Sequence, residues 1–198
     1  MYRLLVQGDW ACFPRPEFVS DRVSYDVISP LAARGILDSI HWRPAVRWVI
    51  DRLKILNPVD LRLRPSDDTG DDEDEDGASV IALRSVAYLI DARMMLTASA
   101  GERDSISGHK QMFERRVRKR QPFRQPYLGV RDCPADFRLL AEDDPEPACP
   151  EGIRGERDWG WLAYDLDDRR HPAIRYFRAR SLDGVIAVPS EHEVALYG

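Results

Sequence analysis

The sequence predicts an α+β fold in which a ferredoxin-like domain precedes a small antiparallel β-sheet. Up to residue 120, the residue patterns follow the order strand, helix, strand, strand, helix, which is typical of a split βαβ sheet. Beyond residue 121 the chain changes to prolines and short β-prone runs separated by loops. We therefore expect two domains, over residues 1–122 and 123–198.

The first elements are predicted from patterns near the start of the chain. The run "YRLLVQGDWACF" indicates a strand, with Gly8 marking a bend or bulge. In "SPLAARGILDSIHW", Ser29 can cap a helix whose first turn accepts Pro30. The run "AVRWVIDRLKILNPV" is rich in β-branched residues, and its apolar positions change alternate face midway, which predicts a strand with a bulge.

The later elements are predicted in the same way. "SVAYLIDARMMLTA" is a long β-prone run, and "HKQMFERRVRKR" combines good helix formers with a narrow apolar stripe of Met112, Phe113 and Val117. After them, "RDCPADFRLLA", "DWGWLAYDL" and "AIRYFRARSLDGVIAVP" have the length and composition of short strands. Asp183 and Gly184 predict a hairpin turn in the last of these runs.

Charge is segregated along the chain, whose formal net charge is −5. Eight acidic residues between Asp67 and Asp76 repel one another and predict a solvated loop over residues 66–78. The segment from Lys110 to Arg124 holds seven basic residues against one acidic residue. That segment predicts either a basic face for a polyanion or a solvated helix face.

Patterns that the sequence lacks disfavour several kinds of protein and site. There is no apolar stretch of about eighteen residues and no signal-peptide pattern, so we expect a cytoplasmic protein that does not bind membranes. Cys12, Cys133 and Cys149 form no C-x-x-C pair, and His171 and His192 lack ligands at metal-binding spacing. Phosphate-cradling loops and nucleophile elbows are also missing. We therefore predict no metal and no cofactor.

Four phrases are distinctive: "GDWACFPRPEFVSDRVSYDVISPLAARGILDSIHWRPAVRWVIDRLKILNP", "MFERRVRKRQPFRQPYLGVRDCPADF", "GWLAYDLD" and "RYFRARSLDGVIAVP". Together, and in this order, they resemble the CRISPR-associated Cas-five family of the d branch, also called Dvulg or type I-C. The resemblance implies a modified ferredoxin-like fold of the RAMP and RRM-related kind, and a metal-independent endoribonuclease that cuts precursor CRISPR RNA in the repeat hairpin. It also implies that the protein stays on the 5′ handle of the mature CRISPR RNA, as a subunit of the type I-C surveillance complex beside the backbone and large subunits.

The resemblance also implies where the active site lies. The family has a tyrosine just before a Trp-x-Pro at the end of the first helix, and a Lys-His pair just before the second helix. Here these positions hold His41 and the pair Gly108 and His109. The tyrosine has become histidine, and the lysine is either lost or displaced to Lys110.

Metal-free RNA cleavage needs a base for the 2′-hydroxyl, an acid for the leaving 5′-oxygen and a cation for the phosphorane. We predict that His41 and His109 share the proton transfers, and that Lys110, Arg115 or Arg116 holds the phosphate. Basic side chains bind RNA phosphates and aromatic rings stack on unpaired bases. The predicted RNA contacts are Arg115, Arg116, Arg118, Lys119, Arg120, Phe123, Arg124 and Tyr127.

Two other functions remain open at this point. The loss of the lysine at Gly108 favours a catalytically silent, RNA-binding structural subunit of the same complex. Nonspecific binding of duplex DNA by the basic face is also compatible with the charge pattern.

Overall fold

The computed structural model describes residues 1–18, 23–65, 79–141, 143–166 and 173–194. The predicted acidic loop over residues 66–78 and His171 lie outside the described residues. The first part of the chain forms β1 (Tyr2–Ala11), α1 (Pro30–Ile40), β2 (Val46–Ile55), β3 (Leu61–Pro65), β4 (Ser79–Leu96) and α2 (Ile106–Lys119). The second part forms β5 (Asp136–Leu139), the short 3-10 helix η1 (Glu151–Ile153), β6 (Glu156–Leu166), β7 (Ile174–Leu182) and β8 (Val185–Ala187).

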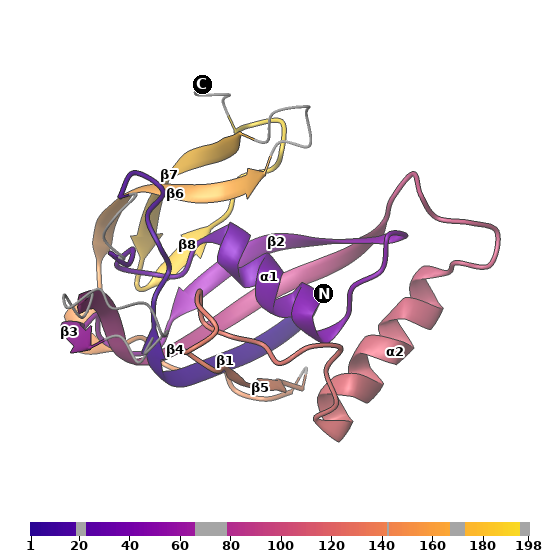
Figure 1. Ribbon diagram of the computed structural model, residues 1–198, viewed down its shortest axis with the longest axis horizontal. Coiled ribbons are helices and arrows are strands. Elements are labelled where there is room, and N and C mark those ends of the chain that lie inside the picture. Colours follow the sequence, from indigo (N-terminus) through magenta and orange to yellow (C-terminus); the bar gives the residue numbers. More distant parts are fainter. Residues whose placement is uncertain (19–22, 66–78, 142, 167–172, 195–198) are drawn as a thin grey trace, which may run out of the picture.

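The strands form one sheet in the order β5-β1-β4-β2-β8-β7-β6, with β3 paired to β4 (Figure 1). Strand β4 lies between β1 and β2 and is antiparallel to both, so β1, α1 and β2 form a split βαβ unit. Strand β1 likewise lies between β4 and β5, which flank α2 in the chain. Two interleaved units of this kind make a ferredoxin-like sheet, which confirms the predicted fold class.

The strands after α2 extend this same sheet on both sides. Strand β5 pairs with β1, while β8 pairs with β2 at Leu53 and Ile186 and joins the β6–β7 hairpin to the sheet. The residues predicted to form a separate small domain are therefore hydrogen-bonded to the first part through two ladders. The division into two domains at residue 122 stays a prediction.

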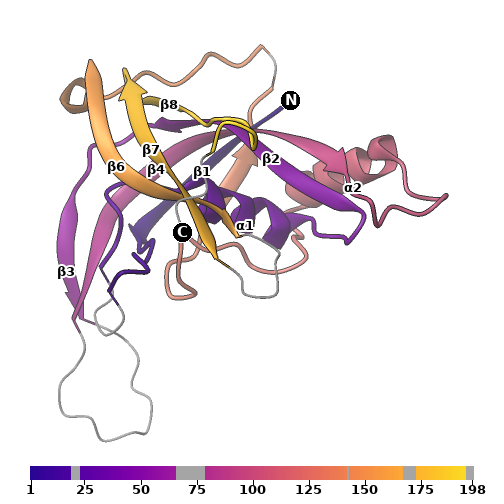
Figure 2. The same cartoon turned by 90° about the horizontal axis from the view of Figure 1, so that it is seen from above.

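Helix α1 starts where the sequence predicts it. The Ser29 hydroxyl accepts the backbone N–H of Ala32 at 3.2 Å, and Pro30 occupies the first turn. Figure 2 shows α1 on one side of the sheet and the segment between β5 and β6 on the other. The apolar side of α1 is buried against the sheet through Ala33, Ile36, Leu37 and Ile40.

Two predicted backbone irregularities are present. The pairing of β2 with β4 shifts between Ile50 and Arg52, so that apolar residues before and after this bulge are buried together. Asp183 and Gly184 have φ values of 50° and 74° between β7 and β8. Both residues thus adopt the left-handed conformation that a tight hairpin requires.

Helix α2 packs through the predicted apolar stripe. Phe113 and Val117 are buried, and the Phe113 ring meets the Trp48 and Tyr2 rings edge-on at centroid distances of 4.6 and 4.9 Å. Because Trp48 belongs to β2 and Tyr2 to β1, this cluster fixes α2 against the end of the sheet near the last turn of α1.

Within the described residues, no helix is long and apolar enough to cross a membrane. The same part of the chain holds no group of three or more His, Cys, Asp or Glu residues arranged to bind a metal. Cys12, Cys133 and Cys149, all in the described part of the chain, form no disulfide.

Candidate active site

Two imidazoles from distant parts of the chain meet where α1 ends and α2 begins. His41 is the C-cap residue of α1, and His109 lies in the first turns of α2. Nε2 of His41 is 3.2 Å from Nδ1 of His109, and the ring centroids are 5.4 Å apart. The two histidines predicted to act together are therefore in direct contact.

Backbone hydrogen bonds hold both residues in place. The N–H of His41 donates to the Leu37 carbonyl at 2.9 Å, and its own carbonyl accepts the indole N–H of Trp48 at 3.1 Å. At the start of α2, the Ser105 hydroxyl accepts the N–H of Gly108 at 3.1 Å and so caps the helix just before His109. Each imidazole is thus fixed by a helix terminus.

Two charged side chains flank the pair. Nε2 of His109 is 3.0 Å from Oδ1 of Asp104, whose Oδ2 accepts the N–H of Gly101 at 2.9 Å. On the other side, Nη1 of Arg116 is 3.3 Å from Nδ1 of His41 and donates to the Ile40 carbonyl at 2.9 Å. Asp104, His109, His41 and Arg116 form a continuous chain of contacts, here named the relay.

The electrostatic surroundings keep His41 neutral. Burial lowers the pKa of His41 to about 4, and the nearby cations Arg116 and Arg43, with His109, act in the same direction. The side chain is only 1% exposed. At the other end of the relay, hydrogen bonds from Gly101 and from His109 lower the pKa of Asp104, so its carboxyl group is ionised at neutral pH.

The relay faces an open cleft of about 390 Å³. The lining residues are His41, Arg43, Arg103, Asp104, Ser105, Gly108, His109 and Met112. Arg43 and Arg103 are exposed cations that the sequence reasoning missed; the signal for Arg43 was its place in "HWRP", two residues after His41. Position 108, where the family pattern has lysine, also borders the cleft, but as glycine it brings no charge.

The predicted phosphate-binding residues lie at several places along α2. Lys110 is half-buried and is not among the residues that line the cleft. Arg115 is exposed and donates to the Met112 sulfur at 3.0 Å, whereas Arg116 faces His41. Arg118 and Lys119 are exposed, and Arg120 forms an ion pair with Asp136. The catalytic roles of His41, His109 and Lys110 remain predictions.

The segment after α2 returns along the end of α1. The N–H groups of Phe123 and Arg124 donate to the carbonyls of Ile40 and Ser39 at 3.1 and 2.8 Å. The Phe123 ring is 49% exposed, with the guanidinium groups of Arg116 and Arg124 at 5.7 and 5.3 Å from its centroid. An exposed ring with cations beside it, next to the relay, suits the predicted contact with an unpaired base.

Tyr127 lies apart from this group of side chains. It is 38% exposed and borders a separate, mostly apolar hollow of about 290 Å³ together with Phe13 and Tyr25. The loop that carries Tyr127 is fixed by a hydrogen bond from the N–H of Cys12 to the Leu128 carbonyl at 3.0 Å. Its predicted contact with RNA therefore concerns a different surface from the relay.

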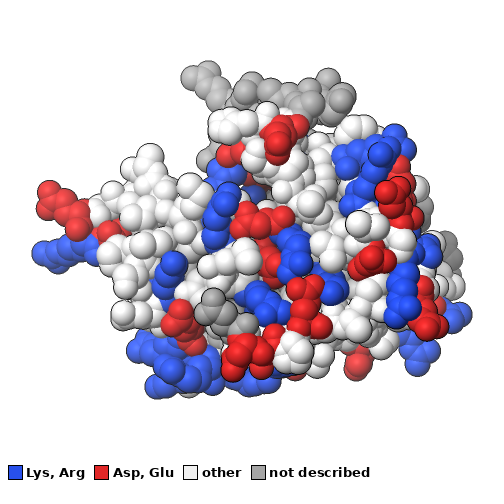
Figure 3. All heavy atoms as spheres, turned by 180° about the vertical axis from the view of Figure 1, so that it is seen from behind, with Lys and Arg blue, Asp and Glu red and all other residues white. Residues whose placement is uncertain are grey.

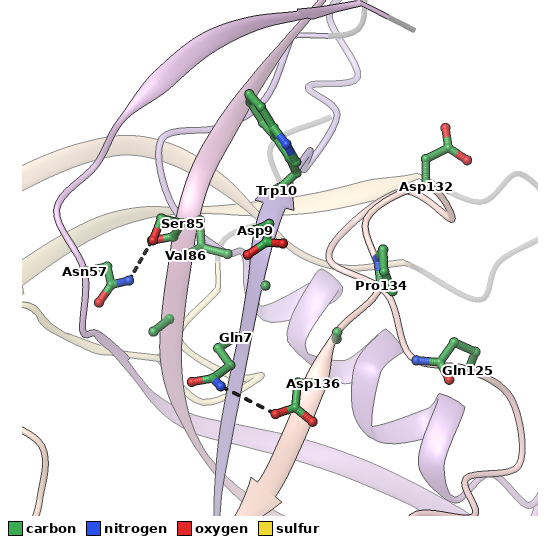
Figure 4. A pocket seen from close by; sticks show the side chains of 13 residues that line it. Gln7, Asp9, Trp10, Asn57, Ser85, Val86, Gln125, Asp132, Pro134 and Asp136 are labelled. Atoms are coloured by element: carbon green, nitrogen blue, oxygen red, sulfur yellow. Dashed lines mark hydrogen bonds between the residues drawn. The ribbon is translucent and has the colours of Figure 1, made fainter. Parts of the chain in front are cut away.

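A larger hollow of about 690 Å³ lies over β1, β4 and β5 (Figure 4). Its polar lining includes Gln7, Asp9, Asn57, Asp132 and Asp136, and no histidine, lysine or arginine among the described residues lines it. Carboxylates repel RNA phosphates, and this lining offers no group suited to proton transfer near neutral pH. The size of a hollow is therefore a poor guide here, and the smaller cleft at the relay is the candidate active site.

The side of the sheet away from α1 has balanced charges. Figure 3 shows acidic and basic side chains interspersed over the middle of this face. Arg52 contacts Asp91 and Glu146 at 2.5 and 3.1 Å, and Lys54 contacts Glu146 at 2.6 Å. This face is therefore a poor match for a polyanion, in contrast to the end of the molecule where Arg43, Arg103 and α2 meet.

Comparison with known proteins places the chain in a family. The family model Cas_Cas5d, described as CRISPR-associated protein (Cas_Cas5), matches residues 1–189. A protein of Mannheimia succiniciproducens named CRISPR pre-crRNA endoribonuclease Cas5d is 39% identical, in an alignment 213 positions long that covers 94% of each chain. The chain belongs to the Cas5d family. A second Cas5d protein of the same name, from Thermus thermophilus, is 33% identical and covers 98% of this chain and 94% of its own.

Solved structures support the fold. A crystal structure of a CRISPR-associated protein superposes with a TM-score of 0.80 at 21% identity, over 98% of this chain and 94% of that one. A functionally uncharacterized protein of Streptococcus mutans, SMU1763c, gives a TM-score of 0.78 at 22% identity, over 98% and 95% of the two chains. At these identities the likeness concerns the fold alone, and the Cas5d assignment depends on the sequence comparisons.

Proposed function

We propose that this Cas5d chain is an endoribonuclease that cleaves precursor CRISPR RNA within the repeat hairpin without a metal ion. We further propose that it then stays on the 5′ handle as a subunit of the type I-C surveillance complex, beside the backbone and large subunits. Two relatives are named pre-crRNA endoribonucleases. The observation that carries the proposal is the 3.2 Å contact between His41 and His109 in an open cleft that also holds arginines.

The chemistry needs one proton acceptor and one proton donor. One imidazole takes the proton of the ribose 2′-hydroxyl, and the resulting oxygen attacks the adjacent phosphorus. The bond from phosphorus to O5′ breaks, and the other imidazole, in its charged form, gives O5′ its proton. The products are a 2′,3′-cyclic phosphate and a 5′-hydroxyl, and the pair as a whole ends with the protons it began with.

Bound RNA makes the charged form of His41 accessible. In the free protein, burial and neighbouring cations hold the pKa of His41 at about 4. A phosphate seated in the cleft places negative charge beside the ring, which stabilises the imidazolium ion and raises that pKa. RNA binding therefore shifts His41 towards the charged form that a proton donor needs.

Arg43 is the cation best placed to hold the scissile phosphate. It lines the cleft, is exposed, and is close enough to influence the charge states of His41 and Asp104. Replacing Arg43 with glutamine should lower the cleavage rate about 10- to 100-fold, because a cation aimed at the phosphorane stabilises the transition state. The matched control is Arg84→Gln, which removes an exposed arginine of β4 that does not line the cleft.

The direct test uses cognate repeat RNA in the presence of EDTA, with a second substrate that carries a 2′-deoxyribose at the cut site. We expect cleavage of the first substrate only, and no cleavage by a His109→Ala variant. Cleavage that disappears on chelation, or that persists with the deoxy substrate, would exclude the proposed chemistry.

A catalytically silent RNA-binding subunit is the second candidate function. Gly108 favours it, because the position that holds lysine in the family pattern supplies no cation here. Tight binding of the repeat RNA with no product in the same assay would establish this alternative. Competition with unrelated duplex DNA in that binding assay measures how much of the affinity is nonspecific.

A further inference from the structure

The relay ends in one group that can only donate hydrogen bonds and one that can only accept them. The guanidinium of Arg116 carries N–H donors and no acceptor, and the ionised carboxylate of Asp104 carries acceptors and no donor. Between them lie two imidazoles, each of which, when neutral, has one donor and one acceptor nitrogen. The two ends together therefore determine where the protons lie.

The positions of the ring protons follow in order from Arg116 to Asp104. Nη1 of Arg116 donates to Nδ1 of His41 over 3.3 Å, so that nitrogen presents its lone pair. The proton of neutral His41 then lies on Nε2, which donates to Nδ1 of His109 at 3.2 Å. His109 in turn carries its proton on Nε2 and donates it to Oδ1 of Asp104 at 3.0 Å.

The opposite arrangement, in which each neutral ring carries its proton on Nδ1, is unfavourable at both ends of the relay. It would set a proton on Nδ1 of His41 against the Arg116 donor, and the lone pair of Nε2 of His109 against the Asp104 carboxylate. Each such conflict loses a hydrogen bond and adds electrostatic repulsion. In the RNA-free protein, burial also keeps His41 neutral, and Arg116, His109 and Arg43 disfavour its charged form as well.

We infer that Asp104 and Arg116 are positioning residues that fix this direction, so that His109 is the base of the reaction and His41 is the donor. The inference rests on the proposed RNA cleavage. Nδ1 of His109 offers the lone pair that accepts the 2′-hydroxyl proton. His41 first takes up a second proton on Nδ1, which replaces the 3.3 Å contact with Arg116 and leaves that guanidinium on the Ile40 carbonyl. The charged ring then gives its Nε2 proton to the leaving O5′ and keeps the proton on Nδ1. Substrate enters by replacing the 3.2 Å contact between the two rings.

Asp104 is itself held in a fixed orientation. Its N–H donates to the Gly101 carbonyl at 3.0 Å, and its Oδ2 accepts the Gly101 N–H at 2.9 Å, which closes a tight turn. Oδ1 is left to face His109. Because the turn uses one carboxylate oxygen, the second one is aimed at the imidazole without further adjustment.

This geometry makes Asp104→Asn a specific test. The asparagine oxygen should take over the Gly101 N–H, so its NH₂ group should face Nε2 of His109. That nitrogen then becomes an acceptor, and the His109 proton moves to Nδ1, where it blocks the base. Long-range ¹H–¹⁵N correlation spectra of the intact, RNA-free protein report which ring nitrogen carries the proton.

We expect wild-type His109 to be protonated on Nε2 and the Asp104→Asn variant on Nδ1. The variant should cleave repeat RNA about 100-fold more slowly or worse, since general base catalysis is worth roughly that factor. Its affinity for the uncleavable 2′-deoxy repeat should stay within about twofold of wild type, because no phosphate contact is removed.

Asp144→Asn is the matched control. Asp144 closes the same kind of turn, with its N–H donating to the Ala141 carbonyl at 3.2 Å and its Oδ2 accepting the Ala141 N–H at 2.8 Å, between β5 and η1. This variant should change neither the His109 tautomer nor the cleavage rate, whereas loss of activity through a weakened turn alone would affect both variants alike.

The outcomes separate the inference from the proposed function. A wild-type His109 protonated on Nδ1 overturns the inference, whether or not the protein cuts RNA. If the proton moves in Asp104→Asn but cleavage continues at the wild-type rate, the assignment of His109 as the base is wrong. Wild-type protein with the expected tautomer but without cleavage refutes the proposed function and leaves the direction of the relay supported.

Discussion

Replacing His41 with glutamine should remove a defined part of the pH dependence of folding stability. Burial first, and the cations Arg116 and Arg43 with it, hold the pKa of His41 at about 4 in the folded protein, against an ordinary value of 6.5. The unfolded chain therefore binds a proton more readily than the folded chain does. The stabilising contribution is fully present above pH 6.5 and is lost as the pH falls from 6.5 through about 4.

The magnitude follows from the two pKa values. At about pH 5 the unfolded histidine is almost fully charged and the folded one is largely neutral, which corresponds to roughly 2 kcal/mol of lost stability relative to pH 8. At about pH 4 the loss approaches roughly 3 kcal/mol. Glutamine does not titrate and so contributes nothing to this loss.

Urea unfolding of the RNA-free protein at several pH values between about 8 and 4.5 measures the effect. The informative quantity is the wild-type free energy of unfolding minus that of His41→Gln. Other titrating groups cancel in this difference, among them Asp38, whose pKa burial raises to about 6 and which acts in the opposite direction. A difference that stays constant within about 0.5 kcal/mol across this range would show that His41 is not held neutral.

Further changes test the packing and the basic surface. Phe113→Ala should lower the free energy of unfolding by about 3 kcal/mol or more, because Phe113 is fully buried against Trp48 and Tyr2; a loss under about 1 kcal/mol in urea unfolding would contradict this packing. Ser29→Ala should cost about 1 kcal/mol by removing the cap of α1, and an unchanged melting temperature would show that the cap is dispensable. Replacing both Arg118 and Lys119 with glutamine should reduce the salt dependence of RNA binding, measured by fluorescence anisotropy, by about 1 to 2 in the log–log slope; an unchanged slope would place RNA elsewhere.

Local residue chemistry made much of the fold predictable. Ser29 and Pro30 mark the start of α1, Asp183 and Gly184 mark the last hairpin, and the change of apolar phase in β2 marks its bulge. Each of these signals depends on residues that are close together in the chain. Strand β3 was not predicted, because it has only five residues and its leucines Leu61 and Leu63 are exposed, so it contributes no buried face to recognise.

The pairing of strands that are far apart in the chain was harder to predict from the sequence. Strand β8 is three residues long, and nothing in "VIA" specifies β2 as its partner; that pairing depends on the hairpin turn and on the bulge in β2. The sequence therefore predicted the small antiparallel sheet but not its hydrogen-bonded connection to β2.

The candidate site was predictable in part. The family resemblance identified His41 and His109, but their flanking partners carry no periodic signal. Asp104 reaches His109 only because the turn from Gly101 redirects the chain before α2 begins. Lys110, next to His109, lies on a different side of α2 from the cleft, as the angle of about 100° between successive helical residues implies.

Trp48 connects the two helices that carry the imidazoles. Its indole N–H holds the carbonyl of His41, and its ring packs against Phe113 of α2. Both halves of the relay therefore depend on the packing of one buried side chain. A loosened interior would pull the histidines apart while leaving every residue of the cleft chemically intact, so that mutations far from the RNA can silence the protein.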